Sequence, residues 1–337
     1  MAKVFFMCKY AILKKRENEV HPVRIRIVGA GALGLLFASK IAATAAIVDL
    51  ITHTQEQSDL LTAKGILAVS SQEEIVYSVD AFSMHTITGA AELLEPVDWL
   101  FLMVKQKDIT AALLQQLLLL VTPTTRIVCF QNGIGHMELL KQHFSNDRLY
   151  AAITTEGALK LSAASFRHSG HGTTWIGRLE NMSSDSVEWD EAEIILQTML
   201  IEAGFNVFLS KKIISNIWNK LLINAVINPL TAILQIKNGA LLESLYIKDL
   251  MSVLFEEGCL VARAANITIA DNLWEQLIHV CEKTAENQSS MLKDILEGRT
   301  TEIDWINGAL IQYANQYKLA LPTHQAFYKM IKHLESR

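Results

Sequence analysis

Three polar side chains recur at four-residue intervals in the apolar stretch IWNKLLINAVINPLTAI, Ile217 to Ile233. They are Lys220, Asn224 and Asn228. Four residues turn an α-helix through about 400°, so the three side chains advance by only about 40° per step and share one face. Lysine and asparagine are costly on a buried surface unless they are hydrogen-bonded. The stretch therefore predicts a helix whose polar face meets a ligand, or a buried helix whose polar groups bond to loop backbones.

A second set of polar side chains interrupts a helical pattern in a later stretch, AENQSSMLKDILEGRTTEIDWINGAL. Asn287, Ser290, Asp294 and Glu302 are its polar members, and Asp294 fits either a helix surface or a supporting position behind a site. Thr300 to Glu302 follow Gly298 and predict a helix start, so we expect Glu302 near a positive helix end.

A glycine-rich loop follows a β-branched run in VRIRIVGAGALGLLFASKIAA. A strand before Gly29-x-Gly31-x-x-Gly34 and a helix after it are the context of a dinucleotide site. Gly29 permits the tight turn, Gly31 lets the backbone approach a pyrophosphate, and Gly34 lets helix pack on strand. A glycine-rich turn without a ligand is the alternative. The predicted cofactor loop comprises Gly29, Ala30, Gly31, Ala32, Leu33 and Gly34.

The next strand, in AAIVDLITHTQEQ, bears on the choice of cofactor. An NAD enzyme usually places a carboxylate at this strand's tip for the ribose hydroxyls. Asp49 lies in mid-strand, whereas the tip is His53, Thr54 and Gln55. No carboxylate there repels a 2′-phosphate, so we expect NADP, with His53 beside it, although no arginine grips that phosphate.

Strands continue to alternate with helices as far as about Val207. Three buried runs end in polar or small residues, at Lys105, at Gln131-Asn132-Gly133 and at Glu156-Gly157-Ala158. Such tips gather around the ligand of an open α/β sheet. The later pattern is helical. We therefore predict an α/β Rossmann-type NADP-binding domain at 23–209 and an all-α substrate and catalytic domain at 210–337, after an N-terminal extension of uncertain order at 1–22.

Composition excludes several classes of protein. The chain has 337 residues, half of them apolar, and a net charge of −5, which argues against nucleic acid as the main partner. Thr110–Val121 is too short to span a bilayer and predicts a buried helix. Four scattered cysteines fit a reducing cytoplasm. The apolar helical half makes a homodimer plausible.

The chain from Val23 onward resembles the ketopantoate reductases (2-dehydropantoate 2-reductases). GAGALG, Lys105, QNG at 131–133, WNKLLINAVINPLTAI, KNGAL, AENQSSMLKDI and TEIDWINGAL carry the resemblance. It implies a helical second domain, a cleft between domains, and Lys220 as the general acid with Glu302 beside it and near the cofactor. The resemblance also implies NADPH or ketoacid contacts by Lys105, Asn132 and Ala158, and substrate contacts by a further set: Asn224, Asn228, Asn238, Asn287 and Ser290.

Two features depart from the family pattern: the first 22 residues are additional, and His53 stands where many members have a basic residue. The function we expect is NADPH-dependent reduction of the 2-keto acid ketopantoate to (R)-pantoate for pantothenate and coenzyme A synthesis. The alternatives are reduction of another branched 2-keto or 3-hydroxy acid, and an NADP-sensing protein without catalysis. His168 and His171 have a metal-like spacing, but no carboxylate or cysteine accompanies them in the sequence, so no metal site is expected.

Overall fold

The computed structural model describes residues 13–16, 19–70, 73–90, 95–179 and 188–337. The chain divides into two compact units. The first comprises residues 1–131 and 138–213, and the second comprises residues 132–137 and 214–337. The chain therefore makes a short excursion into the second unit at 132–137 and returns to the first unit before it enters the second unit for good at residue 214. The boundaries predicted from the sequence did not include this excursion.

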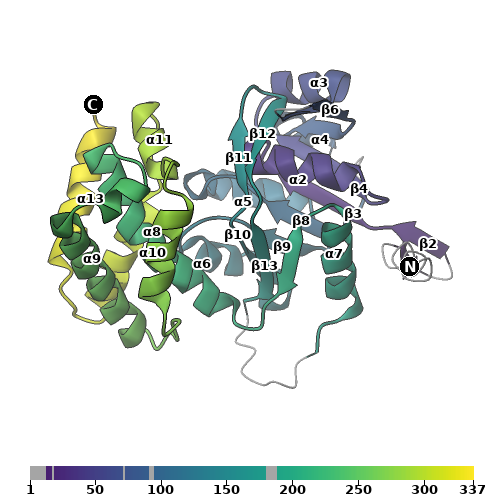
Figure 1. The fold of residues 1–337 in the computed structure, drawn as a ribbon. Helices are drawn as coiled ribbons and strands as arrows, with labels where there is room; N and C mark the ends of the chain where they lie inside the picture. The colour runs from purple at the N-terminus through teal and green to yellow at the C-terminus, as the bar shows by residue number, and fades with distance from the viewer. Residues whose placement is uncertain (1–12, 17–18, 71–72, 91–94, 180–187) are drawn as a thin grey trace, which may run out of the picture. The chain divides into compact units, whose positions relative to one another are not determined.

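An eight-stranded sheet forms the centre of the first unit (Figure 1). Six strands run parallel in the order β7-β4-β3-β8-β9-β10, so the chain starts in the middle, builds one side and then crosses to the other. This is the strand order of the doubly wound dinucleotide-binding sheet, whose ligand lies where the order reverses, here between β3 and β8. The strands are β3 (Arg24–Val28), β4 (Ile47–Thr52), β7 (Asp80–Ser83), β8 (Trp99–Leu102), β9 (Arg126–Cys129) and β10 (Leu149–Thr154).

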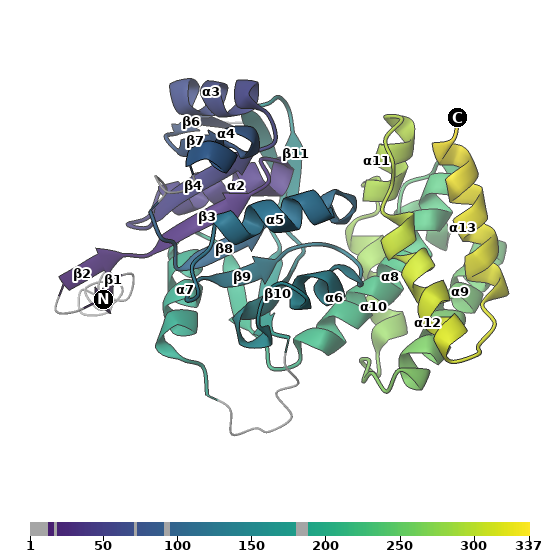
Figure 2. The ribbon, with the colours of Figure 1, turned by 180° about the vertical axis from the view of Figure 1, so that it is seen from behind.

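Helices cover both faces of this sheet. Helix α2 (Ala32–Ala42) lies in front of the sheet in Figure 1, and α5 (Ala111–Leu119) lies on the opposite face in Figure 2. Most residues of β3 and α2 are buried, and their apolar side chains pack in one core with apolar residues of α7 (Glu191–Glu202). Among the described residues, this unit also contains α3 (Gln55–Lys64) and α4 (Met84–Ala90), and α6 (His136–Lys141) begins in the second unit and continues into the first.

Two further strands, β13 (Thr173–Arg178) and β14 (Asn206–Leu209), extend the main sheet beyond β10. They run parallel to each other, and β13 pairs antiparallel with β10. The smaller sheet has the order β11-β12-β5-β6, built from β11 (Gly157–Lys160), β12 (Ser165–Gly170), β5 (Ile66–Val69) and β6 (Glu74–Tyr77).

Part of the N-terminal extension forms a hairpin of its own. Strands β1 (Leu13–Arg16) and β2 (Glu19–Pro22) pair antiparallel as a two-stranded sheet. Most of Val4–Leu13, the apolar part of the extension, lies outside the described residues.

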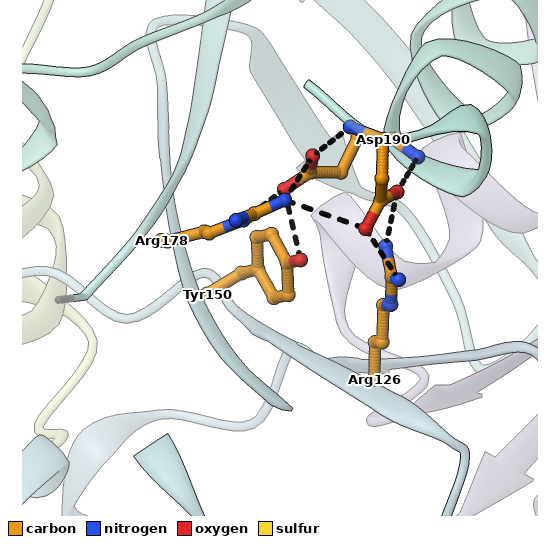
Figure 3. A network of polar contacts seen from close by, with 5 residues as sticks. Arg126, Tyr150, Arg178 and Asp190 are labelled. Carbon is orange, nitrogen blue, oxygen red and sulfur yellow. Dashed lines mark hydrogen bonds and ion pairs between the residues drawn. The ribbon is translucent and has the colours of Figure 1, made fainter. Parts of the chain in front are cut away.

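A charged network fastens α7 to the sheet (Figure 3). Asp190 caps α7 by accepting from the Glu193 backbone, while both Asp190 oxygens accept from the Arg126 guanidinium at 2.8 and 2.6 Å. Arg178 donates to Glu193, and so does the Tyr150 hydroxyl, at 2.9 Å. Because β9, β10 and β13 each contribute one of these partners, the network fixes the antiparallel extension of the sheet. Burial is the main cause that raises the pKa of Tyr150 well above its usual range, so this hydroxyl stays a hydrogen-bond donor.

The second unit is helical. Its longest helices are α8 (Ile213–Leu234) and α9 (Leu245–Ala264). The others are α10 (Leu273–Lys283), α11 (Ser290–Leu296), α12 (Asn307–Gln316) and α13 (Pro322–Glu335). Trp218 and Tyr313 pack edge to face within its core.

Helix α8 runs through Pro229 without a break. Proline has no N–H, so the carbonyl of Ala225, four residues earlier, loses its helical donor. The Asn307 side chain supplies a replacement by donating to Ala225 O at 2.9 Å. The structure thus satisfies this carbonyl from a neighbouring helix.

Two expectations about elements need correction. Helix α5 was predicted to be buried, but Leu118 and Leu119 are exposed and only one face packs inward. The alternation of strands was predicted to end near Val207, yet β14 spans Asn206–Leu209 and leads directly toward α8. The four-residue run Asn206–Leu209 is too short for periodicity to separate a strand from a helix start.

Helix α8 is also the one described helix whose length and apolar composition would allow it to cross a membrane. Most of its apolar window, 61%, is buried inside the protein, as expected of the central helix of a packed unit. The polar face of the same helix leads to the candidate site.

Candidate active site

Lys220 and Glu302 come together in the second unit although 82 residues separate them. Burial lowers the pKa of the Lys220 ammonium to about 8, and the Glu302 carboxylate opposes that shift by electrostatic attraction. An ammonium with a pKa near neutrality can hold a proton and also release it, as general acid catalysis requires. The pair therefore has the composition and the electrostatics of an acid catalyst held by a carboxylate.

Asn132 completes this cluster. Its side-chain amide donates to Glu302 Oε2 at 3.1 Å. Ile134 N also donates to Trp305 O at 3.4 Å, so the excursion at 132–137 packs along the segment that carries Glu302. Glu302 itself stands at the N-cap position of the short 3₁₀-helix η5 (Ile303–Trp305), close to the predicted helix start.

The side chain of the preceding residue, Gln131, binds to the backbone of the first unit. Its amide donates to Leu102 O at 2.8 Å and to Val104 O at 2.9 Å, at the end of β8 in the first unit. The QNG motif therefore places its glutamine in one unit and its asparagine in the other. This division is invisible in the sequence, where the motif reads as a strand end followed by a turn.

The rest of the polar face on α8 follows Lys220 by one and two turns. Asn224 is half-buried and Asn228 is buried. Asn238 follows the helix and is also buried; its amide donates to Thr284 Oγ1 at 2.8 Å, and its backbone N donates to Asn287 O at 3.0 Å. The buried side-chain oxygen of Asn238 has no hydrogen-bond donor among the described residues. Such an orphaned acceptor fits a site that receives a hydroxyl or another donor from a ligand.

Asn287 and Ser290 differ from the buried Asn228 and Asn238, because both are exposed. The buried serine is its neighbour Ser289, which caps α11 and accepts from Thr231 Oγ1 at 2.7 Å. Asp294, which the sequence left ambiguous, is buried and accepts from Arg299 Nε at 2.9 Å, so it supports the local structure.

The glycine loop in the first unit has the construction of a phosphate cradle. Gly29 has φ +115°, and a Cβ there would lie 2.8 Å from the Met103 and Val104 backbone; a Cβ on Gly34 would lie 1.9 Å from Gly29 O. By contrast, a Cβ on Gly31 would have no neighbour within 4 Å. Packing therefore explains two of the three glycines, and the open space over Gly31, at the start of α2, suits a pyrophosphate.

The tip of β4 carries no carboxylate. Asp49 is buried in mid-strand and accepts from Arg26 Nη2 at 2.7 Å, so it is committed to the sheet. His53 is exposed just beyond the strand, and its ring packs edge to face with His85 at a centroid distance of 5.6 Å. Sequence reasoning missed His85, because the pairing of β4 with β7 that brings it there has no local signal.

Lys105 and Ala158, two other predicted cofactor contacts, are half-buried in the first unit. Lys105 stands beyond β8, and Ala158 lies on β11 in register with His168. A further cation, Lys160, donates to Ala30 O in the glycine loop at 3.0 Å. Burial lowers the pKa of this ammonium. The sequence gave no sign of this contact, which depends on the fold of β11 over α2.

Together these features describe a class of protein. A glycine loop at the switch point of a parallel sheet, with a lysine–carboxylate pair in a helical unit, defines a dinucleotide-dependent oxidoreductase in two parts. Comparisons with known proteins identify the family within that class. Residues 25–181 match the ketopantoate reductase PanE/ApbA family model, and residues 212–335 match the model of its C-terminal domain.

Relatives named 2-dehydropantoate 2-reductase match along nearly the whole chain. That of Bacillus subtilis is 31% identical and that of Pyrococcus horikoshii 29% identical, each covering 93% of this chain and 98% of the relative. A crystal structure of a probable 2-dehydropantoate 2-reductase from Bacillus subtilis has a TM-score of 0.76 at 30% identity, covering 93% of this chain and all of the other. A D-mandelate dehydrogenase structure shares the fold, with a TM-score of 0.81 at 24% identity and coverage of 93% and 99%.

The chain belongs to the ketopantoate reductase family and is an oxidoreductase. The family membership indicates a nicotinamide dinucleotide as the class of cofactor and a small keto acid as the class of substrate.

Proposed function

We propose that this protein catalyses the NADPH-dependent reduction of 2-dehydropantoate to (R)-pantoate, a step of pantothenate and coenzyme A synthesis, in the cytoplasm. The observation that carries the proposal is the cluster of Lys220, Glu302 and Asn132 in the helical unit, found in a chain whose relatives bear this activity. Two observations support the proposal together: many dehydrogenases share the glycine loop, and the lysine–glutamate pair supplies a candidate proton donor for this reaction.

The proposed chemistry divides between the units. The glycine loop would hold NADPH, which would supply the hydride for the C2 carbonyl carbon. The Lys220 ammonium polarises the carbonyl oxygen and then donates its proton to the alkoxide, a contribution typically worth roughly 10²–10⁴-fold in rate. Glu302 favours the charged form of Lys220, and the amide of Asn132 holds that carboxylate in place.

The polar residues around Lys220 would hold the substrate. Asn224 and Asn228, one and two helical turns on, can donate to the carbonyl and hydroxyl oxygens. The Asn238 side-chain oxygen, which has no donor among the residues that the structure describes, can accept from the distal hydroxyl. Exposed Ser290 and Asn287 can reach the carboxylate without the cost of desolvating a second charge.

The choice of NADPH rests on the tip of β4. His53 and His85 offer two imidazoles at the position where NAD enzymes place an acid, and neither would repel a 2′-phosphate. We expect kcat/KM for NADPH to exceed that for NADH by at least about tenfold, or about 1.4 kcal/mol. Aspartate in place of His53 should erode or invert this ratio. Equal use of both cofactors by the unchanged enzyme would refute the preference.

A substrate panel tests the reaction itself. Purified protein is assayed with NADPH and either 2-dehydropantoate or other branched 2-keto acids, with oxidation of 3-hydroxy acids followed in the reverse direction. The proposal requires the highest kcat/KM for 2-dehydropantoate. Turnover of another acid alone would identify a related reductase, and cofactor binding without any turnover would identify an NADP-sensing protein.

A further inference from the structure

Three metal-ligating side chains that have no role in the proposed reaction converge in the first unit. They are Glu156, His168 and His171, and one ligand atom from each lies within 4.8 Å of the other two. His168 Nε2 is 2.6 Å from Glu156 Oε2, and the two imidazole rings have a centroid distance of 4.2 Å. The histidine spacing was visible in the sequence, but the carboxylate that accompanies the pair arrives from the preceding strand connection.

The backbone holds these three residues in place. Glu156 lies between β10 and β11, His168 lies on β12, and His171 lies in the short connection from β12 to β13. Thr155 N donates to Thr173 O at 3.0 Å, and Thr173 N donates to Thr155 Oγ1 at 2.8 Å, so the segments carrying Glu156 and His171 are tied together.

Gly172 allows this close approach. A Cβ at Gly172 would lie 2.3 Å from the Thr155 carbonyl carbon and 2.5 Å from the Glu156 backbone nitrogen. Only glycine therefore permits the His171 connection to lie against Thr155 and Glu156. The positions of the three ligands depend on sheet pairing and on this contact, so the group is preorganised rather than a chance meeting of long side chains.

The three side chains differ in solvent exposure in a way that suits a bound cation. The Glu156 side chain is only 2% exposed and the His168 side chain 16% exposed, whereas His171 is exposed. A buried carboxylate needs a compensating positive charge. Lys40 is in electrostatic contact with Glu156, but burial lowers the pKa of the Lys40 ammonium. One side of the group is therefore anchored in the protein, and the other opens to solution for ligand entry.

We propose that Glu156, His168 and His171 bind a divalent transition-metal ion of the Zn²⁺ type. Two imidazoles and one carboxylate, with a fourth position left for water, are a common ligand set for Zn²⁺. Bond lengths of about 2.0–2.2 Å to these atoms imply ligand atoms about 3.3 Å apart in a tetrahedral site. The Glu156–His168 contact would open by less than about 1 Å, and His171 would close onto the ion.

The test uses the full chain, freed of metal with a chelator, and titrated with ZnCl₂ by calorimetry and with CoCl₂ by visible absorption. We expect one equivalent of either ion to bind, and Co²⁺ to give the spectrum of a tetrahedral site. Because His171 is exposed, His171→Ala should fold normally and weaken Zn²⁺ binding by at least about tenfold. Glu156→Gln should weaken it too, with folding checked by circular dichroism.

His279 provides a matched control. It is an exposed histidine with a neighbouring carboxylate, Glu282, at 3.9 Å, but no third ligand accompanies the pair among the described residues. His279→Ala should leave Zn²⁺ affinity unchanged. Absence of a stoichiometric Zn²⁺ equivalent, or equal affinity in the unchanged protein and His171→Ala, would overturn the proposal and leave a hydrogen-bonded His168–Glu156 pair. Neither outcome bears on the reductase reaction.

Discussion

Gly31 and Gly34 lie three residues apart in the same loop, yet the structure gives them different tasks. A Cβ on Gly34 would lie 1.9 Å from Gly29 O, so Gly34→Ala must separate helix from strand. We expect a loss of about 1–3 kcal/mol of unfolding free energy, the usual cost of forcing atoms into a packed region. A Cβ on Gly31 meets no protein atom within 4 Å. Gly31→Ala should therefore keep its stability and weaken NADPH binding at least tenfold.

Denaturant unfolding and fluorescence titration with NADPH, carried out on both variants, separate these effects. A Gly31→Ala protein that binds NADPH normally would show that no phosphate approaches the loop at that point.

The lowered pKa of Lys220 predicts that the reaction rate depends on pH. The pKa of the ammonium is lowered to about 8, chiefly by burial, and the proton donor must be charged to act. The rate of ketoacid reduction should therefore be high below pH 8 and fall as the pH rises through that value. Because the Glu302 carboxylate raises this pKa, Glu302→Gln should move the falling limb to lower pH.

Asp304→Asn serves as the control for that shift. Asp304 lies two residues from Glu302 but accepts from Lys332 at 3.1 Å and from the Tyr328 hydroxyl at 2.6 Å. Its loss should leave the limb of the pH–rate profile where it is. A Glu302→Gln profile that superimposes on that of the unchanged enzyme would separate Glu302 from the proton donor.

At the scale of elements, helix α8, which bears Lys220, Asn224 and Asn228, contains Pro229. The Asn307 amide replaces the donor that Pro229 lacks, and Asn307 also hydrogen-bonds with His324 Nδ1 at 2.8 Å. Asn307→Ala should cost about 1–3 kcal/mol of unfolding free energy, because it leaves a buried carbonyl unsatisfied. Urea denaturation measures this cost. Asn315→Ala, at an exposed position of the same helix α12, should change stability by less than about 0.5 kcal/mol, and equal losses in the two variants would contradict this assignment.

The periodicity of the sequence predicted helices and strands more successfully than it predicted which residues lie in contact. The four-residue spacing of Lys220, Asn224 and Asn228 was enough to place them on one helix, and the strand–glycine loop–helix order was enough to predict the parallel sheet. Both signals are local. The contacts of His85 with His53, and of Glu156 with His168, arise from strand order and sheet pairing, which leave no trace in a linear pattern.

At the scale of the whole molecule, the proposed mechanism assigns cofactor binding to one unit and proton donation to the other. The glycine loop belongs to the first unit, and Lys220 and Glu302 belong to the second. The excursion at 132–137 gives the second unit its Asn132, a division that no boundary drawn on the sequence could anticipate because the crossing occurs inside one short motif. If this division of labour holds, the two functions should be separable by substitution.

The most direct test is the Lys220→Ala enzyme, with kcat for 2-dehydropantoate and Kd for NADPH measured on the same folded preparation. Proton donation by Lys220 predicts that kcat falls by about 10²-fold or more. NADPH binding, which we assign to the other unit, and the melting temperature should remain close to those of the unchanged protein. A well-folded Lys220→Ala enzyme with near-normal kcat would contradict the mechanism.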